Sequence, residues 1–84
     1  MPRKSLSGNS AESLRFRGTL AANLRRIATS KSLSMPDVAD LAGMKRERIY
    51  SIVSAIAGTQ AIELAVLAKV LEVSMDELVK GGVE

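Results

Sequence analysis

The stretch that decides the fold is LSMPDVADLAGMKRERIYSIV, which occupies residues 33–53. Ser34 can cap the free backbone N–H groups of a helix, and Pro36 and Asp37 are both favoured in a first helical turn. Gly43 is expected to end this helix, because glycine readily adopts the left-handed conformation that follows many helices. A second apolar stripe begins shortly afterwards. The stretch therefore predicts two short helices joined by a tight turn, a helix-turn-helix unit.

The second helix of this unit is predicted to span about residues 45–56. Its apolar residues recur at three- and four-residue spacings, which places them on one face, toward the core. These core-facing residues are Ile49, Ile52, Val53 and Ile56. The opposite face carries Arg46, Glu47, Tyr50, Ser51 and Ser54. Because the apolar stripe continues to Ile56, we expect the helix to end near Gly58.

One helix is predicted before this unit. Apolar residues recur at helical spacing from Leu20 to Ala28. Two starts fit the sequence: Thr19 is a reasonable N-cap, whereas Ser10 can begin a longer helix or a separate one. Residues 1–17 are therefore predicted to form a flexible basic arm, which is helical in part if the earlier start is used.

Two helices are predicted after the unit. Thr59 or Gln60 can cap the first of them. Its apolar positions are Ile62, Leu64, Ala65, Leu67, Ala68 and Leu71. Ser74 and Glu77 then form the signature of a capping box for a short fifth helix, which a pair of glycines ends. Since no segment alternates as a strand would, the chain is predicted to be all-α, with its domain at residues 18–80 and a tail at residues 81–84.

The composition excludes several classes of function. The 84 residues allow one small domain, and they include no cysteine and no histidine. Without cysteine the chain has no disulfide and no thiol nucleophile, and without histidine it lacks the commonest general base and the commonest metal ligand. We therefore expect no enzymatic activity, no cofactor and no metal. With 46% hydrophobic residues but no apolar run of membrane-spanning length, the chain is expected to be a cytoplasmic globular protein.

The charges are distributed unevenly along the chain. Up to Tyr50 there are ten basic and four acidic residues, a net charge of +6, and beyond it there are two basic and five acidic residues, a net charge of −3. A basic half favours a polyanion such as nucleic acid as partner. Because Phe16 and Tyr50 are the only aromatic residues, a base-stacking platform for single strands is not expected. No lysine or arginine occurs from Ile49 to Ala68.

Over about residues 20–79 the chain resembles the lambda-repressor/Cro-like helix-turn-helix family. The matching stretches are residues 20–27, residues 33–43, Ile49 with Ile52, and residues 67–78. The resemblance implies a compact five-helix domain that binds double-stranded DNA sequence-specifically as a dimer. It further implies a repressor-like transcriptional regulator of bacterial or phage origin, with the helix at about residues 45–56 in the major groove.

The resemblance also implies which residues contact DNA and a second subunit. Base contacts are expected from Arg46, Glu47, Tyr50 and Ser51, since arginine pairs with guanine and glutamate accepts from cytosine. Phosphate contacts are expected from Ser34, Lys45, Arg48, Arg3 and Lys4. The predicted dimer interface consists of Met75, Leu78 and Val79 on the fifth helix. Arg25, Arg26 and Lys31 are interpreted as solubilising charges.

The sequence departs from the family pattern at positions with structural consequences. Similar proteins often have an arginine and a glutamate that form an ion pair at the positions of Ala28 and Val53. Here both charged residues are replaced together, so no unpaired charge is left behind. Ala55 stands where a glycine usually follows the recognition helix, and Met35 stands where a glutamine often touches a phosphate.

Two alternative functions remain open. One is an antitoxin that binds a toxin and regulates its own operator with the same helix-turn-helix. The other is a protein-interaction module that keeps the fold without binding DNA, which the uncharged stretch after Arg48 favours.

Overall fold

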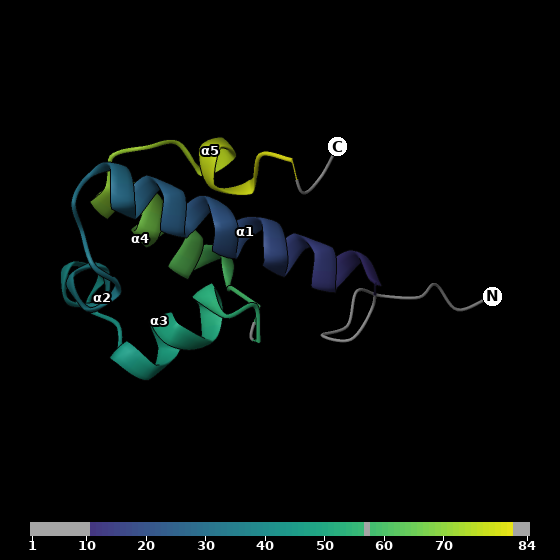
Figure 1. Cartoon of the computed structure of the whole chain (residues 1–84), viewed down its shortest axis with the longest axis horizontal. Coiled ribbons are helices and arrows are strands. Elements are labelled where there is room, and N and C mark those ends of the chain that lie inside the picture. The colour runs from purple at the N-terminus through teal and green to yellow at the C-terminus, as the bar shows by residue number, and fades with distance from the viewer. Residues whose placement is uncertain (1–10, 57, 82–84) are drawn as a thin grey trace.

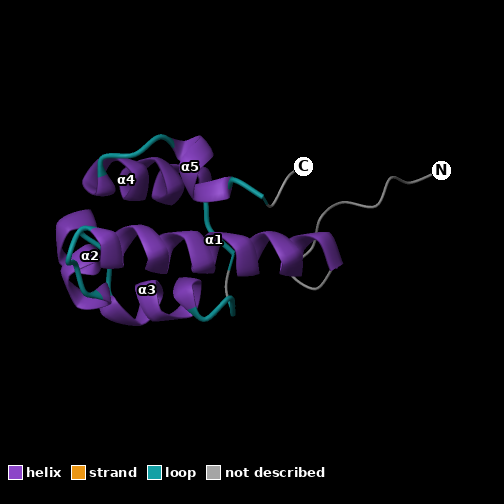
Figure 2. Ribbon diagram, turned by 45° about the horizontal axis from the view of Figure 1, so that its top comes forward, coloured by secondary structure: helices purple, strands orange, loops and turns teal. Residues whose placement is uncertain are grey.

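The computed structural model describes residues 11–56 and 58–81, and within these ranges the chain forms five helices and no strand. The helices are α1 (Ala11–Ser30), α2 (Met35–Ala42), α3 (Arg46–Val53), α4 (Ala61–Leu71) and α5 (Met75–Val79). The long helix α1 crosses the whole molecule, with α2 near its C-terminal end (Figure 1), and α3 lies on the opposite side of α1 from α4 and α5 (Figure 2). The predicted all-α, five-helix fold is confirmed.

Helix α1 uses the earlier of the two starts that fit the sequence. It is already helical at Ala11, so Thr19 lies inside the helix rather than at its cap. Residues 11–17, which were predicted to belong to the arm, are part of α1, and among them Phe16 packs against the core and Arg17 is buried. The rest of the predicted arm lies outside the described residues.

Helix α2 begins and ends where the sequence predicts. The Ser34 hydroxyl accepts from the Asp37 N–H (3.2 Å), and the Ser34 N–H donates to the Asp37 carboxylate (3.0 Å). This backbone hydrogen bond from Ser34 is the main reason that the pKa of Asp37 is lowered. At the other end Gly43 is left-handed, with φ of 69°, and the Met44 N–H returns to the Ala39 carbonyl (2.9 Å).

Helix α3 ends earlier than predicted. Its last residue is Val53, and Ala55 adopts a left-handed conformation with φ of 61°. The Ile56 N–H then closes the helix on the Ser51 carbonyl (3.0 Å), as in a Schellman motif. The predictions that α3 continues to Gly58 and that Ile56 faces the core are therefore wrong: a left-handed residue interrupts the helix, and Ile56 is 72% exposed.

The cap predictions for the last two helices are resolved by side-chain contacts. Gln60, not Thr59, is the N-cap of α4, and its N–H donates to the Glu63 carboxylate (2.9 Å). Ser74 caps α5 by accepting from the Glu77 N–H (3.2 Å), which is the serine half of the predicted capping box. Both caps involve only residues close in sequence, which explains why the sequence pattern predicts them.

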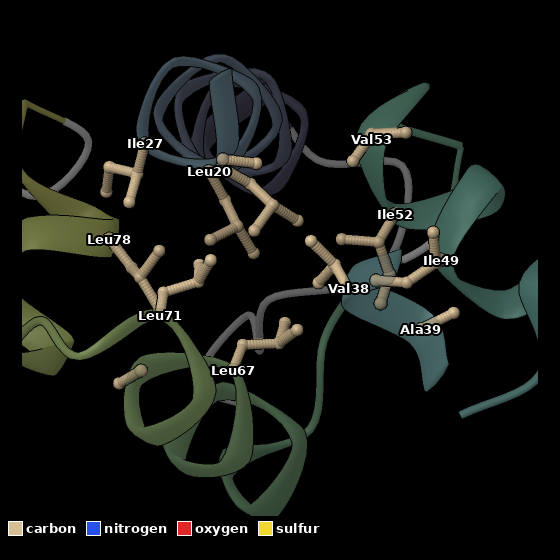
Figure 3. Packing of buried hydrophobic residues seen from close by; sticks show 13 residues of the cluster. Leu20, Ile27, Val38, Ala39, Ile49, Ile52, Val53, Leu67, Leu71 and Leu78 are labelled. Carbon is tan, nitrogen blue, oxygen red and sulfur yellow. The ribbon is translucent and has the colours of Figure 1, made fainter. Parts of the chain in front are cut away.

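The core lies between α1 and the four other helices. Aliphatic side chains from all five converge there (Figure 3). The most deeply buried are Leu20, Leu24, Val38, Ile49, Ile52, Leu67, Leu71 and Leu78. Ala28 and Val53 belong to the same cluster, which agrees with the expectation that this pair of positions is apolar in this chain. The recognition-helix candidate α3 is thus anchored to α1 through its inner face.

Candidate nucleic-acid interface

The outer face of α3 presents the residues predicted to touch bases. Arg46, Glu47 and Tyr50 are exposed, and Ser51 is half-buried. They lie opposite Ile49 and Ile52, which are 0% and 1% exposed. The structure therefore brings all four residues onto one short helix whose backbone is fixed by the core, with Ser51 at the margin of the exposed face.

Arg46 also makes the only ion pair described between α2 and α3. Its Nη2 lies 3.4 Å from Asp40 Oδ2, and the two side chains are 61% and 64% exposed. A pair this open to water contributes about 0–1 kcal/mol, so the arginine can exchange Asp40 for another acceptor at little cost.

Two of the predicted phosphate contacts lie at helix starts. Ser34 is exposed at the N-cap of α2, where the helix dipole favours an anion. Lys45 is exposed at the N-cap of α3 and makes no capping hydrogen bond with its side chain. At Ser34, however, the Asp37 carboxylate already accepts the N–H of the cap residue. Arg3 and Lys4 lie outside the described residues.

Arg48, the remaining predicted phosphate contact, is engaged within the protein. Its Nε and Nη2 donate to the two carboxylate oxygens of Glu63 at 2.8 and 2.5 Å, and Nη2 also donates to the Gly58 carbonyl (3.0 Å). The side chains of Arg48 and Glu63 are only 31% and 20% exposed. These hydrogen bonds lower the pKa of Glu63 and raise that of Arg48. The pair connects α3 to the first turn of α4.

Sequence reasoning missed the Arg48–Glu63 pair, although a signal was present. Glu63 is the only charged residue between Ile49 and Ala68. A single carboxylate within an uncharged segment, one helix away from a basic cluster, points to a specific partner.

Two arginines of α1 bind the end of α3, a role the sequence analysis did not assign. Arg17 is 8% exposed and its Nη1 donates to the Ile56 carbonyl (2.6 Å). Arg25, which was interpreted as a solubilising charge, donates from Nη2 to the Val53 carbonyl. Carbonyls at a helix C-terminus lack intrahelical partners and carry partial negative charge, so guanidinium groups are well suited to them. These contacts fix the C-terminal end of α3 against α1.

The predicted dimer patch on α5 is smaller than expected. Leu78 is fully buried and closes the core, so its assignment to a dimer interface is wrong. Asn23 of α1 holds this end in place by donating to the carbonyls of Leu78 (2.9 Å) and Lys80 (3.1 Å). Met75 is 40% exposed and Val79 is half-buried, so only these two remain available to a partner.

Two other kinds of site are absent from the parts of the chain that the structure describes. No helix there combines the length and apolar character needed to cross a bilayer. Within the same residues, no group of three or more acidic side chains is arranged to hold a metal ion.

Comparisons with known proteins identify similar structures. No protein-family model matches the chain, and none of the curated proteins does. Among solved structures, the restriction-modification controller protein C.AhdI from Aeromonas hydrophila superposes with a TM-score of 0.71 at 24% identity, covering 74% of this chain and 94% of that one.

Two further structures superpose equally well. An HTH_3 family transcriptional regulator from Vibrio cholerae has a TM-score of 0.73 at 23% identity, and the match covers 77% of this chain but 36% of the regulator. The hypothetical transcription factor NHTF from Neisseria has a TM-score of 0.74 at 19% identity, over 94% of this chain and 85% of that one. The arrangement of the five helices is therefore shared with these proteins.

Proposed function

We propose that the chain is a sequence-specific, double-stranded-DNA-binding regulator of transcription. The proposal is supported by its helix-turn-helix fold, which it shares with a restriction-modification controller protein, an HTH_3 family transcriptional regulator and a hypothetical transcription factor. The observation that carries the proposal is the outer face of α3, where Arg46, Glu47 and Tyr50 are exposed on a helix whose inner face is anchored in the core. We propose a repressor-like protein without enzymatic activity, which acts on DNA in the cytoplasm of a bacterial cell.

The head of α3 supplies the proposed base contacts. Arg46 can donate two hydrogen bonds to O6 and N7 of a guanine, and Glu47 can accept from the amino group of a cytosine. Tyr50 and Ser51 lie one turn further along and add contacts at the neighbouring base pairs. A bidentate arginine–guanine contact discriminates by about 1–3 kcal/mol. Arg46 can leave its solvent-exposed contact with Asp40 and bind a base edge with little loss of free energy.

The proposed phosphate contacts surround this face. Lys45 and Ser34 lie at the two helix starts, and Arg3 and Lys4 add charge from the arm. The contacts of Arg48 with Glu63 and Gly58 favour a role in holding the segment after α3 over a direct contact to phosphate. If the three cations Lys45, Arg3 and Lys4 each neutralise one phosphate, the logarithm of the affinity falls with the logarithm of the salt concentration with a slope of about −3.

The proposal is tested by selecting bound sequences from a random duplex pool and then titrating the selected duplex by fluorescence anisotropy. Arg46→Ala is compared with Arg26→Ala, which removes the same charge from an exposed position on α1. Arg46→Ala is expected to lose about 5- to 150-fold in affinity and to relax the selected sequence at one position, whereas Arg26→Ala should change little. Absence of binding at low salt, or equal losses in the two variants, would contradict the proposal.

A protein-interaction module with the same fold is the second candidate. It is favoured by Ile56 and Ile62, which are 72% and 69% exposed, and by the absence of lysine and arginine from Ile49 to Ala68. An antitoxin would combine such a surface with binding to its own operator. Duplex selection separates these functions, because a pure interaction module enriches no sequence and an antitoxin enriches one while also binding a toxin.

A further inference from the structure

The second half of α3 carries two of the residues proposed to contact bases. Tyr50 is 48% exposed and Ser51 is half-buried, and both lie beyond the midpoint of this eight-residue helix. An isolated helix of fewer than about 12 residues is marginal in water, so a helix this short depends on contacts with its surroundings. How firmly its last turn is held therefore affects how well these two side chains are placed for DNA.

The backbone of this last turn is closed by the residues directly after the helix. The Ser54 N–H donates to the Tyr50 carbonyl (3.0 Å), and the Ile56 N–H donates to the Ser51 carbonyl (3.0 Å). Between these two donors lies Ala55, whose left-handed conformation ends the helix. The backbone of both candidate base-contacting residues is thus held by a closing turn in which an alanine adopts the conformation that glycine favours.

The end of the helix leaves carbonyl groups that need partners from elsewhere. In a continuing helix, the Val53 carbonyl would accept from the N–H four residues further on. Here it accepts from Nη2 of Arg25, and the Ile56 carbonyl accepts from Nη1 of Arg17 (2.6 Å). Both arginines belong to α1, which lies alongside α3 (Figure 2). They bind the chain on either side of Ala55, so two side chains of another helix complete the hydrogen bonding of the closing turn.

The neighbouring Arg26 shows that this contact depends on position and not on charge alone. Successive residues of a helix point in directions about 100° apart, so Arg25 and Arg26 cannot both reach α3. Arg26 donates from Nη2 only to Asn23 Oδ1, at 3.5 Å and within α1 itself. Both arginines are exposed residues on the same turn. Arg26 therefore carries the same charge as Arg25 without the contact to the end of α3.

We propose that Arg25 is a positioning residue for DNA recognition, which holds the Val53 carbonyl and so keeps Tyr50 and Ser51 ordered before DNA binds. The inference rests on the proposed function and divides its base contacts into two groups. The first turn of α3, with Arg46, follows directly on the turn after α2 and does not depend on Arg25. Without Arg25, the last turn must be ordered as DNA binds, and that cost reduces the affinity.

The first measurement tests the contact without DNA. Backbone order parameters from NMR relaxation are compared among the unsubstituted chain, Arg25→Ala and Arg26→Ala, after circular dichroism has shown that each protein is folded. In Arg25→Ala the order parameters at Ser54 and Ile56 should fall from about 0.85, the value of rigid backbone, toward about 0.6. Those in the first turn of α3 should not change, and Arg26→Ala should leave both ends of α3 ordered. Unchanged values at Ser54 and Ile56 in Arg25→Ala overturn the inference.

The second measurement is a fluorescence anisotropy titration with the duplex selected from a random pool and with a random duplex. Arg25→Ala should lose about 3- to 10-fold in affinity for the selected duplex, the effect of one hydrogen bond. Its affinity for random duplex should stay within about twofold, because phosphate contacts dominate that binding. Arg26→Ala should stay within about twofold on both. Equal losses on the two duplexes, with a salt slope about 1 unit shallower, would identify Arg25 as a phosphate contact and overturn the proposal. Reduced thermal stability with unchanged affinity would show a purely structural role and also overturn it.

A double-mutant cycle locates the effect along α3. The loss caused by Arg25→Ala should shrink by at least about twofold in a Tyr50→Ala background, since ordering the last turn then brings DNA less benefit. In an Arg46→Ala background the same loss should be undiminished. Equal coupling to both positions contradicts the division of the base contacts.

The two measurements also distinguish failure of this inference from failure of the proposed function. If the unsubstituted chain enriches no duplex, the regulator function fails and the role of Arg25 in recognition falls with it, whatever the order parameters show. If the chain binds a selected duplex and Arg25→Ala binds it equally well, the regulator function stands and the positioning role is wrong.

Discussion

Replacement of Ala55 by glycine should stabilise the protein. Ala55 has φ of 61°, and a left-handed conformation costs a residue with a Cβ about 1–2 kcal/mol relative to the right-handed one. Glycine avoids this cost but gains more freedom in the unfolded chain, which offsets about 0.4–1 kcal/mol. The difference predicts that Ala55→Gly raises the free energy of unfolding by about 0.5–1 kcal/mol.

The measurement is urea and thermal unfolding followed by circular dichroism. For a domain of this size, 1 kcal/mol corresponds to about 4–8 °C in Tm, so we expect an increase of about 2–8 °C. The matched control is Ala65→Gly, the same chemical change at an exposed position inside α4. There glycine should destabilise by about 1 kcal/mol, because the residue is helical and alanine is the better helix former.

The two variants must change stability in opposite directions if α3 ends at Val53. If Ala55→Gly destabilises the protein as Ala65→Gly does, residue 55 is helical in solution and α3 continues toward Gly58, as the apolar stripe in the sequence suggested. In that case Ile56 would face the core instead of being exposed.

Two further predictions concern arginines near the same segment. Glu63→Gln should lower the free energy of unfolding at pH 7 by about 1–2 kcal/mol, since it weakens a half-buried charged pair with Arg48. Hydrogen bonds from Arg48 hold the pKa of Glu63 below its ordinary value of 4.5, so the stabilisation is complete above that pH and is lost as the pH falls through the lower folded-state pKa. The difference between the two proteins in urea unfolding should therefore shrink toward pH 3, and a difference independent of pH would contradict this account. Arg25→Ala should destabilise by about 1 kcal/mol through the loss of its bond to the end of α3, whereas Arg26→Ala, one residue away and bonded only weakly to Asn23, should change thermal stability by less than about 0.5 kcal/mol. If Arg25→Ala and Arg26→Ala reduce stability equally, the loss of a positive charge, and not the loss of the contact with the end of α3, explains the change.

The helix-turn-helix unit could be predicted because its boundaries are encoded locally. Ser34, Asp37 and Gly43 act on backbone groups within three or four residues of themselves, so the order of residue types is sufficient to place α2. The inner face of α3 followed from spacing alone, and Ile49 and Ile52 are buried as expected. The same locality explains the outward position of Arg46, which the sequence assigned to the candidate site.

The end of α3 could not be predicted because distant residues help to determine it. The apolar spacing continues through Ile56, and alanine at position 55 is by itself a strong helix former. The structure instead places Arg17 and Arg25 of α1 against the carbonyls of Ile56 and Val53. Such contacts between long side chains and backbone depend on how helices far apart in sequence are arranged, which periodicity does not encode.

The same contacts change how the basic half of the chain should be interpreted. In the charge count taken from the sequence, every arginine up to Tyr50 adds to the basic half that favours a polyanion. In the structure, Arg25 donates to the carbonyl of the last residue of α3, Arg17 donates to a carbonyl after α3, and Arg48 donates to Gly58 and Glu63. The proposed DNA contact is then concentrated at the two helix starts and the arm, and the segment after α3 is both uncharged and internally hydrogen-bonded. This segment has no positive charge of its own, and the arginines beside it are already hydrogen-bonded within the protein. Both features suit the segment to a protein partner rather than to phosphate.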